Sequence, residues 1–438
     1  MALRRELGPF SALLITVGAM IGSGIFATPH DVALTVHTPG LILGLWAIGG
    51  FLALLGAMSF VELGAAIPET GGLYVYLCRA YGPMSGFVFA WAMLVVMVPS
   101  SLGYFAQVTA RHTTALFGLS GGWDPPLAIA VITGLVVVNL GGVRSGAAVQ
   151  NVTTLIKYGG VLGIALIGWF LAPVAAPVAS ALSETSGLAL LAALVPVLWA
   201  YDGWIDITSI AGEVKDPARA IPRSLAIGTL LVTGLYILAN LTYLKVLGTA
   251  GLAASETPAA TAAASLLGPA GHALVSMLIG ISTLGGCAVA LLTGSRVVYA
   301  VAADGLFLKA FARTSPQGVP DVAIMACGAL AVLYIVSPVG RLGELFVIGA
   351  WPFYACGAVA TIVLRRREPA LPRPVRTWAY PLPIVVFALA SVAIVIGYGM
   401  TNPWQTLLSF GLIGLGVPVY GLFRACKAAV IADPTASD

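Results

Sequence analysis

The chain has 438 residues, of which 59% are hydrophobic and 9% are charged, with 21 Lys and Arg against 17 Asp and Glu. A soluble globular chain carries about 25% charged and 45–50% apolar residues. The composition therefore excludes a soluble domain, a disordered chain and a disulfide scaffold. A net charge of +4 also excludes a basic nucleic-acid binder. The sequence predicts an integral membrane protein that lies in the lipid bilayer and has no nucleic-acid partner.

Long apolar runs separated by short polar breaks divide the chain. A spanning helix needs about 20 mainly apolar residues. The runs are continuous rather than alternating, which excludes a transmembrane β-barrel. We predict an all-α integral membrane protein with twelve spans, at 9–35, 40–63, 85–117, 126–143, 148–173, 187–213, 223–247, 270–304, 320–338, 343–364, 378–400 and 404–424.

The positions of the cations predict the orientation, because Lys and Arg accumulate on the cytoplasmic side of membrane proteins. With the N-terminus inside, the outer segments hold only Arg111, Lys245 and Arg341. Lys157 lies within a span, and every other cation falls in a cytoplasmic segment. The first apolar run is too long for a signal peptide. We expect a multi-pass protein of the cell membrane with both termini in the cytoplasm.

The first span contains Gly18, Gly22, Ser23 and Gly24 in its middle. Each Gly inside a helix costs about 1 kcal/mol relative to Ala. Gly18 and Gly22 could form a small-residue face for helix packing, but that interpretation does not account for Gly24. The Gly-Ser-Gly run favours a local unwinding of this helix near the middle of the membrane.

The sixth span is interrupted by Asp202 and Gly203, between Trp199 and Trp204. An acidic residue within the membrane is costly and usually functional. Alternatively, Asp202 is the N-cap of a half-helix that begins at Gly203 or Trp204. Both interpretations require a broken helix. Interruptions at corresponding places in two halves of a chain are typical of inverted-repeat transporters.

The two breaks also indicate a ligand. After Gly22, the N–H groups of Ser23, Gly24 and Ile25 would carry the positive end of a helix dipole, which suits a carboxylate. The free carbonyls around Met20 and Trp199 would suit an ammonium group. An α-amino acid has both groups, so the hypothesis is an amino-acid carrier.

Two other classes of membrane protein are less favoured. A channel would need a continuous polar stripe or a ring of charges along a pore, whereas the spans show isolated polar breaks. An enzyme would need paired acids or a histidine cluster at the depth of the membrane centre, and the sequence has neither. The sequence therefore predicts a protein that is not an enzyme and has no cofactor, metal or catalytic residue.

Two charged residues carry further hypotheses. Lys157 lies about 12 Å along the fifth span, near the middle of a hydrocarbon core about 30 Å thick. We interpret it as a fixed cation that binds helix carbonyls where a sodium ion would otherwise bind; the alternative is a lysine facing a water-filled vestibule. Glu213 follows the second half of the sixth span and is the best candidate for an inner gate, with ordinary interfacial charge as the alternative.

Long motifs carry a family resemblance over most of the chain. The run VGAMIGSGIFATP, the segment PGLILGLWAIGGFLALLGAMSFVELGAAIPETGGLYVYLCRAYGP and the run WAYDGWIDITSIAGEVKDPARAIPRSL resemble the L-type amino-acid transporter family of the amino acid, polyamine and organocation superfamily. The resemblance implies a LeuT-like fold of five plus five helices with two more appended, and sodium-independent exchange. The first repeat would cover 1–175, the second 185–368, the last two helices 378–424 and a cytoplasmic tail 425–438.

The resemblance also implies roles for residues. Ser23 and Gly24 would bind the substrate carboxylate, and carbonyls of Met20, Trp199 and Asp202 its amino group. Trp199 would be the aromatic gate that covers bound substrate. Lys157 matches the lysine that takes the place of sodium, and Ser282 or Thr283 would accept a hydrogen bond from it.

Two differences within the family refine these expectations. Eukaryotic members bind a single-span glycoprotein through a cysteine between the third and fourth helices, and residues 111–126 contain no cysteine. We expect a stand-alone monomer of a bacterial inner membrane. Relatives with an acid at the position of Asp202 include carriers of cationic amino acids, but a capping role would engage its oxygens. Neutral substrates are therefore favoured, with cationic amino acids or polyamines as the alternative.

Overall fold

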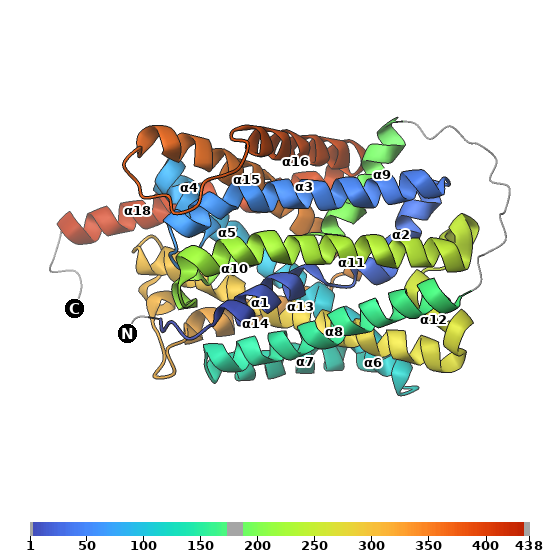
Figure 1. The fold of residues 1–438 in the computed structure, drawn as a ribbon. Coiled ribbons are helices and arrows are strands. Elements are labelled where there is room, and N and C mark those ends of the chain that lie inside the picture. Colours follow the sequence, from blue (N-terminus) through green and yellow to red (C-terminus); the bar gives the residue numbers. More distant parts are fainter. Residues whose placement is uncertain (1–2, 173–186, 433–438) are drawn as a thin grey trace.

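The computed structural model describes residues 3–172 and 187–432, and in these ranges the chain is helical, with a single isolated β-bridge between Leu7 and Val214. Most helices run along one direction, and the start of α1 and the end of α18 lie at the same end of the bundle, on the left in Figure 1. We call this the terminal end. The predicted repeat boundary between 175 and 185 and the last six residues of the predicted tail lie outside the described residues.

The first half of the chain forms the helices up to α8. Proline occupies the first helical position of α1, α3 and α5, where its missing N–H costs nothing. The elements are α1 (Pro9–Met20), α2 (Gly24–Thr35), α3 (Pro39–Ala66), α4 (Leu73–Tyr81), α5 (Pro83–Ala92), the π-helical turn η1 (Met93–Met97), α6 (Val98–Leu116), the 3₁₀ turn η2 (Gly121–Trp123), α7 (Asp124–Leu140) and α8 (Val143–Leu171).

The second half begins at Gly187, and its helices continue to Ala432. Two of them, α11 and α13, are the longest in the described chain. The elements are α9 (Gly187–Ala200), α10 (Asp206–Ser209), the 3₁₀ turn η3 (Ala211–Glu213), α11 (Pro217–Ala254), α12 (Pro258–Leu267), α13 (Pro269–Ala303), the 3₁₀ turn η4 (Lys309–Ala312), α14 (Asp321–Tyr334), α15 (Val339–Arg367), α16 (Leu382–Thr401), α17 (Pro403–Gly414) and α18 (Gly416–Ala432).

Eleven stretches of the described chain are helical, long and apolar enough to cross a membrane. They correspond to the predicted spans except the ninth, which was expected at 320–338. That stretch is α14, a helix of 14 residues, because the chain turns after Tyr334. This length is below the roughly 20 residues of a full span. The last predicted span was expected to end at 424, but α18 continues to Ala432.

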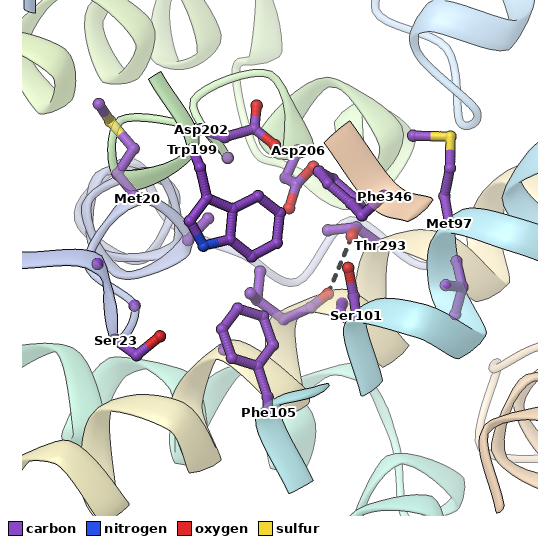
Figure 2. Close-up of a pocket in the computed structure, with 18 of the residues that line it drawn as sticks. Met20, Ser23, Met97, Ser101, Phe105, Trp199, Asp202, Asp206, Thr293 and Phe346 are labelled. Atoms are coloured by element: carbon purple, nitrogen blue, oxygen red, sulfur yellow. Dashed lines mark hydrogen bonds between the residues drawn. The ribbon is translucent and has the colours of Figure 1, made fainter. Parts of the chain in front are cut away.

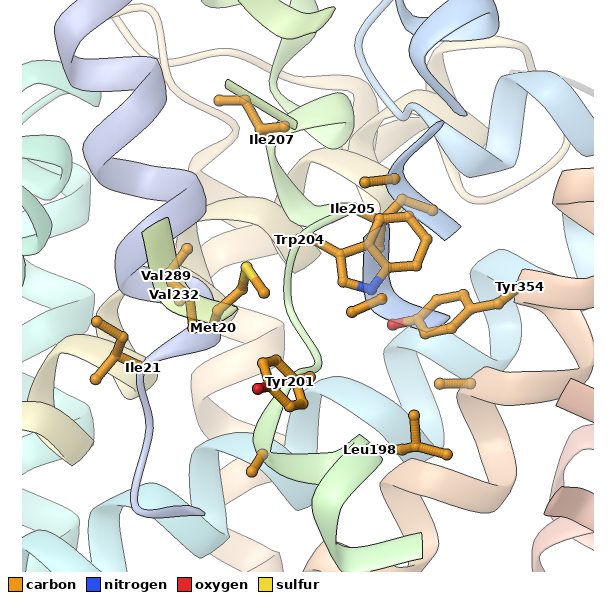
Figure 3. Close-up of a cluster of buried hydrophobic side chains, with 14 of the residues drawn as sticks. Met20, Ile21, Leu198, Tyr201, Trp204, Ile205, Ile207, Val232, Val289 and Tyr354 are labelled. Atoms are coloured by element: carbon orange, nitrogen blue, oxygen red, sulfur yellow. The ribbon is translucent and has the colours of Figure 1, made fainter. Parts of the chain in front are cut away.

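The two interrupted spans lie inside the bundle. Helix α1 packs against α8, α11 and α13, and α9 packs against α2, α3 and α16, so segments from both halves of the chain surround the interrupted spans. Figure 3 shows side chains of the first interruption, Met20 and Ile21, in one buried cluster with Tyr201 and Trp204 of the second. Buried aromatic rings contribute large apolar areas, which hold this irregular backbone in place.

Candidate functional site

The first interruption lies between α1 and α2. Helix α1 ends at Met20, Ile21 is extended with φ −82° and ψ 90°, and α2 begins at Gly24. The first N–H groups of a helix have no intrahelical acceptor. No side chain caps α2 at Ser23; the Phe26 N–H donates to the Ser23 carbonyl oxygen at 3.1 Å, so Gly24 and Ile25 carry the N–H groups that a ligand could meet.

The second interruption lies between α9 and α10. Helix α9 ends at Ala200, residues 201–205 form turns, and the short helix α10 begins at Asp206 with Ile205 at its N-cap. Asp202 is therefore not the N-cap of a half-helix that begins at Gly203 or Trp204, and this alternative is wrong. Gly203 in these turns has φ +102°, a conformation that favours glycine.

The two interruptions cross in direct backbone contact. A Cβ atom on Gly203 would lie 2.6 Å from the carbonyl oxygen of Ala19, and a Cβ on Gly24 would lie 2.6 Å from the Cβ of Ala200. No larger residue fits at either place without a shift of the backbone. The glycines of the two motifs therefore bring the interrupted chains together.

A cavity lies beside this crossing and is lined by residues of both interruptions. Figure 2 shows Trp199, Asp202 and Asp206 around it, with Phe105 and Phe346 from other helices. Seven of the predicted substrate-binding residues line the cavity, whereas Ile25 does not; the seven are Met20, Gly22, Ser23, Gly24, Trp199, Asp202 and Gly203.

The carbonyls that the first interruption frees are bound by side chains from other helices. Lys157, which is fully buried on α8, donates from Nζ to the carbonyl oxygens of Gly18 at 2.5 Å and Ile21 at 2.6 Å. Ser282 of α13 donates to Ile21 at 3.0 Å and to Gly22 at 2.9 Å. Buried polar groups need such partners.

Ser282 and Lys157 thus share one acceptor. The structure does not pair them as donor and acceptor, which differs from the expected hydrogen bond. Thr283 instead lies 2.7 Å from the hydroxyl of Thr109 and donates to the carbonyl of Ile279. Ser282 therefore acts beside Lys157 on the interrupted helix, and Thr283 joins α13 to α6.

A tyrosine that the sequence did not point to joins the two interruptions. The hydroxyl of Tyr236, buried on α11, lies 2.9 Å from the carbonyl oxygen of Met20 and 3.1 Å from that of Ala200. The only sequence signal was a tyrosine within an apolar span, whose hydroxyl needs a partner when buried. The Tyr236 hydroxyl thus contacts the last carbonyl of α1 and the last carbonyl of α9.

Aromatic rings meet at the edge of the cavity where α9 ends, and α9 extends from here away from the terminal end (Figure 1). The Trp199 ring lies edge-on to Phe346, with ring centres 5.2 Å apart, and to Tyr104, with ring centres 5.7 Å apart. The hydroxyls of Tyr104 and Ser23 are 2.8 Å apart. Trp199 and Ser23 belong to the interrupted spans, whereas Tyr104 and Phe346 belong to α6 and α15. The sequence had indicated Trp199 alone.

A buried ion pair lies on the other side of the cavity. Arg296 Nε of α13 donates to Glu213 Oε1 at 2.7 Å, and both side chains are fully buried. The carbonyl of Glu213 also accepts the backbone N–H groups of Glu6 and Leu7, at 3.0 Å each. The chain before α1, the end of the sixth span and α13 therefore meet at Glu213. Arg296 was missed because an arginine near the end of a span resembles an ordinary interfacial cation.

A helical membrane bundle with a covered cavity at the crossing of two interrupted spans defines a transporter of a small solute. The chain belongs to the amino acid permease family, whose model matches residues 7–422. Members of this family, including the relatives below, are amino acid transporters and not enzymes.

Three relatives indicate the range of substrates that are named within the family. The chain is 33% identical to the b(0,+)-type amino acid transporter 1 of Mus musculus, over 96% of this chain and 88% of that one. It is 31% identical to the serine/threonine exchanger SteT of Bacillus subtilis (strain 168), over 98% of both chains. It is 30% identical to the large neutral amino acids transporter small subunit 2 of Homo sapiens, over 96% of this chain and 81% of that one.

Proposed function

We propose that this chain is a sodium-independent exchanger of L-amino acids that works by alternating access. The observation that carries this proposal is the cavity at the crossing of the two interruptions. The first N–H groups of α2 face a carboxylate there, and the carbonyls at the end of α9 and near Met20 face an ammonium group. The backbone then binds the part common to all α-amino acids, and the remaining cavity receives the side chain.

The proposed architecture is the LeuT-like inverted repeat, with both interrupted spans unwound near the middle of the membrane. Residues 1–175 and 185–368 are its repeats, and 378–424 form two added helices. The terminal end faces the cytoplasm, because it holds the excess of Lys and Arg. We propose a stand-alone monomer in a bacterial inner membrane, since residues 111–126 lack a cysteine for a heavy subunit.

Sodium independence is supported by Lys157. Its ammonium group binds two carbonyls of the first interruption, and such carbonyls are the ligands that a sodium ion would need. A covalently attached cation satisfies the same oxygens in the absence of any ion. The ammonium is fully buried, so water does not compete for it.

Alternating access is supported by the contacts on the two sides of the cavity. Trp199 meets Phe346 and Tyr104 on one side, and Glu213 meets Arg296 on the other. Each contact joins an interrupted span to α6, α13 or α15. We propose that the aromatic contact is open when the ion pair is closed, and that the ion pair is open when the aromatic contact is closed.

Neutral amino acids are the first candidate substrates. Most of the cavity wall is apolar and consists of side chains such as Met93, Met97, Val98, Val289 and Phe346. These side chains match an aliphatic or small substrate side chain.

Cationic amino acids or polyamines are a second candidate, and a specific observation favours them. Asp202 and Asp206 both line the cavity. Asp202 is 8% exposed, and its Oδ1 atom has no hydrogen-bond partner among the described residues. The Gly203 N–H and the Tyr354 hydroxyl interact with this carboxylate, but Oδ1 remains available to a substrate cation.

Exchange in proteoliposomes tests both candidates. The purified chain is reconstituted with alanine, leucine, arginine, putrescine or no solute inside, and uptake of each labelled amino acid is measured with and without sodium. Sodium-independent uptake that needs internal amino acid supports exchange, and uptake into empty vesicles at the same rate contradicts it. The variants Asp202→Asn and Asp206→Asn distinguish neutral from cationic substrates. Loss of arginine uptake with retained leucine uptake supports the second candidate.

A further inference from the structure

Two grooves open on the surface of the bundle at the terminal end, on either side of the start of α11. The first lies between α1 and α11 and includes Phe10 and Leu13 of α1. The second lies between α3 and α11 and includes Met58 and Val61 of α3. Both grooves are separate from the cavity at the interruptions, because they share no lining residue with it.

The same three residues of α11 line both grooves. Arg219, Arg223 and Ile227 follow one another at intervals of four residues, which places them on one face of the helix. They extend over about 12 Å. The ridge between the two grooves therefore has two cations at the end of the bundle and an apolar side chain one turn deeper.

The two arginines face one carboxylate, that of Asp216, which also lines the first groove. The Arg219 side chain is 76% exposed, and its nearest ion-pair partner, Asp216, is 3.9 Å away. Within the part of the chain that the structure describes, Arg223 forms no ion pair. Six other arginines lie within 3.1 Å of a carboxylate oxygen. The ridge thus carries positive charge that an external anion could balance.

The walls of the grooves are apolar and uncovered. Phe10 is 66% exposed and Ile227 is 46% exposed. A free phosphate would use the two guanidinium groups but not these walls. A phospholipid has one phosphate and two acyl chains, which matches one pair of arginines between two apolar grooves.

We propose that the ridge formed by Arg219, Arg223 and Ile227 binds an anionic phospholipid. The phosphate lies on the two guanidinium groups, and one acyl chain occupies each groove. Basic pockets between helices at the cytoplasmic surface recognise anionic headgroups by the same chemistry. A bound lipid contacts α1, α3 and α11 together, and α1 leads directly to the first interruption.

Spin-labelled lipids test the proposal on the full chain in phosphatidylcholine vesicles. We expect labelled phosphatidylglycerol to associate more strongly than labelled phosphatidylcholine. The double variant Arg219→Gln/Arg223→Gln is expected to lower this preference at least about fivefold, because each cation near the surface attracts anionic lipid. The double variant Lys309→Gln/Arg366→Gln removes two exposed charges that line neither groove and is expected to keep the preference.

A second variant tests the grooves themselves. Ile227→Trp fills both grooves and retains the two arginines. It is expected to weaken the association of phosphatidylglycerol. If the arginine variant does not fold, Ile227→Trp takes its place as the test. Millimolar glycerol phosphate is expected not to displace the labelled lipid. The proposal is overturned if the two lipids associate equally with the natural chain, or if Arg219→Gln/Arg223→Gln or Ile227→Trp leaves the lipid preference unchanged. It is also overturned if the control variant loses the preference equally, or if glycerol phosphate displaces the labelled lipid.

Discussion

Lys157 donates a hydrogen bond of 2.6 Å to the carbonyl oxygen of Ile21, the extended residue directly after the end of α1. Ser282 of α13 donates to the same oxygen. An interrupted helix in a membrane exposes carbonyls that no water can satisfy, and each needs a partner from the protein. The interruption is therefore held open by donors on α8 and α13.

Lys157→Ala is expected to lower exchange at least tenfold while the protein remains folded. The variant leaves two buried carbonyls with fewer donors, at a cost of about 1–3 kcal/mol for each unsatisfied group. Exchange in proteoliposomes measures the activity, and size-exclusion chromatography measures the folded fraction. Lys245→Ala is the control, because Lys245 binds the Trp169 carbonyl at an exposed site. Full exchange by the Lys157 variant would contradict a role in transport for its hydrogen bonds to the first interruption.

Trp199→Ala is expected to raise the apparent KM for the transported amino acid. The substitution removes the edge contacts with Tyr104 and Phe346 that cover the cavity, each worth about 0.5–1.5 kcal/mol. We expect an increase of roughly tenfold. Trp199→Phe retains a ring at this position and should show a smaller change. An unchanged KM in the alanine variant would remove the gate assignment.

Tyr236→Phe is expected to slow exchange and lower the melting temperature. The hydroxyl bonds to Met20 and Ala200, and its loss leaves both carbonyls with one donor fewer. Tyr201→Phe is a matched control. Its ring centre lies 5.0 Å from that of Tyr236, but its buried hydroxyl has no partner among the described residues. Removal of that hydroxyl should leave stability unchanged or raise it. Equal effects of the two substitutions would refute a specific role for Tyr236.

Substitutions of Glu213 and Arg296 are expected to have non-additive effects on the melting temperature. Removal of one member of a buried pair leaves an uncompensated charge and typically costs about 3–5 kcal/mol, whereas replacement of both by apolar residues is often neutral. Glu213→Leu and Arg296→Met alone should therefore lower the melting temperature more than the double substitution. If the double variant shows the sum of the single effects, the two side chains do not act as a pair. Exchange by the stable double variant then reports whether the ion pair is needed for transport.

The sequence predicts the membrane class and the family because those depend on local patterns. Apolar runs predict the spans, and the glycines and Asp202 mark the places where α1 and α9 end. Tyr236 and Arg296 could not be predicted, because their partners lie 216 and 83 residues away and only the packing of helices brings them together. The capping role of Asp202 was wrong because the chain makes turns up to Ile205 before the next helix. α14 was predicted too long, because hydropathy does not show where a helix ends.

The close crossing at Gly24 and Gly203 has a mechanical consequence. In the proposed alternating access, we expect the two segments to pivot about this contact, because close-packed backbone atoms resist sliding. Helix α1 has 12 residues and is about 18 Å long. A tilt of about 10° at this fulcrum therefore swings Pro9 through about 3 Å. In the proposed transport cycle, a slight rotation beside the solute would thus produce a larger displacement at the surface.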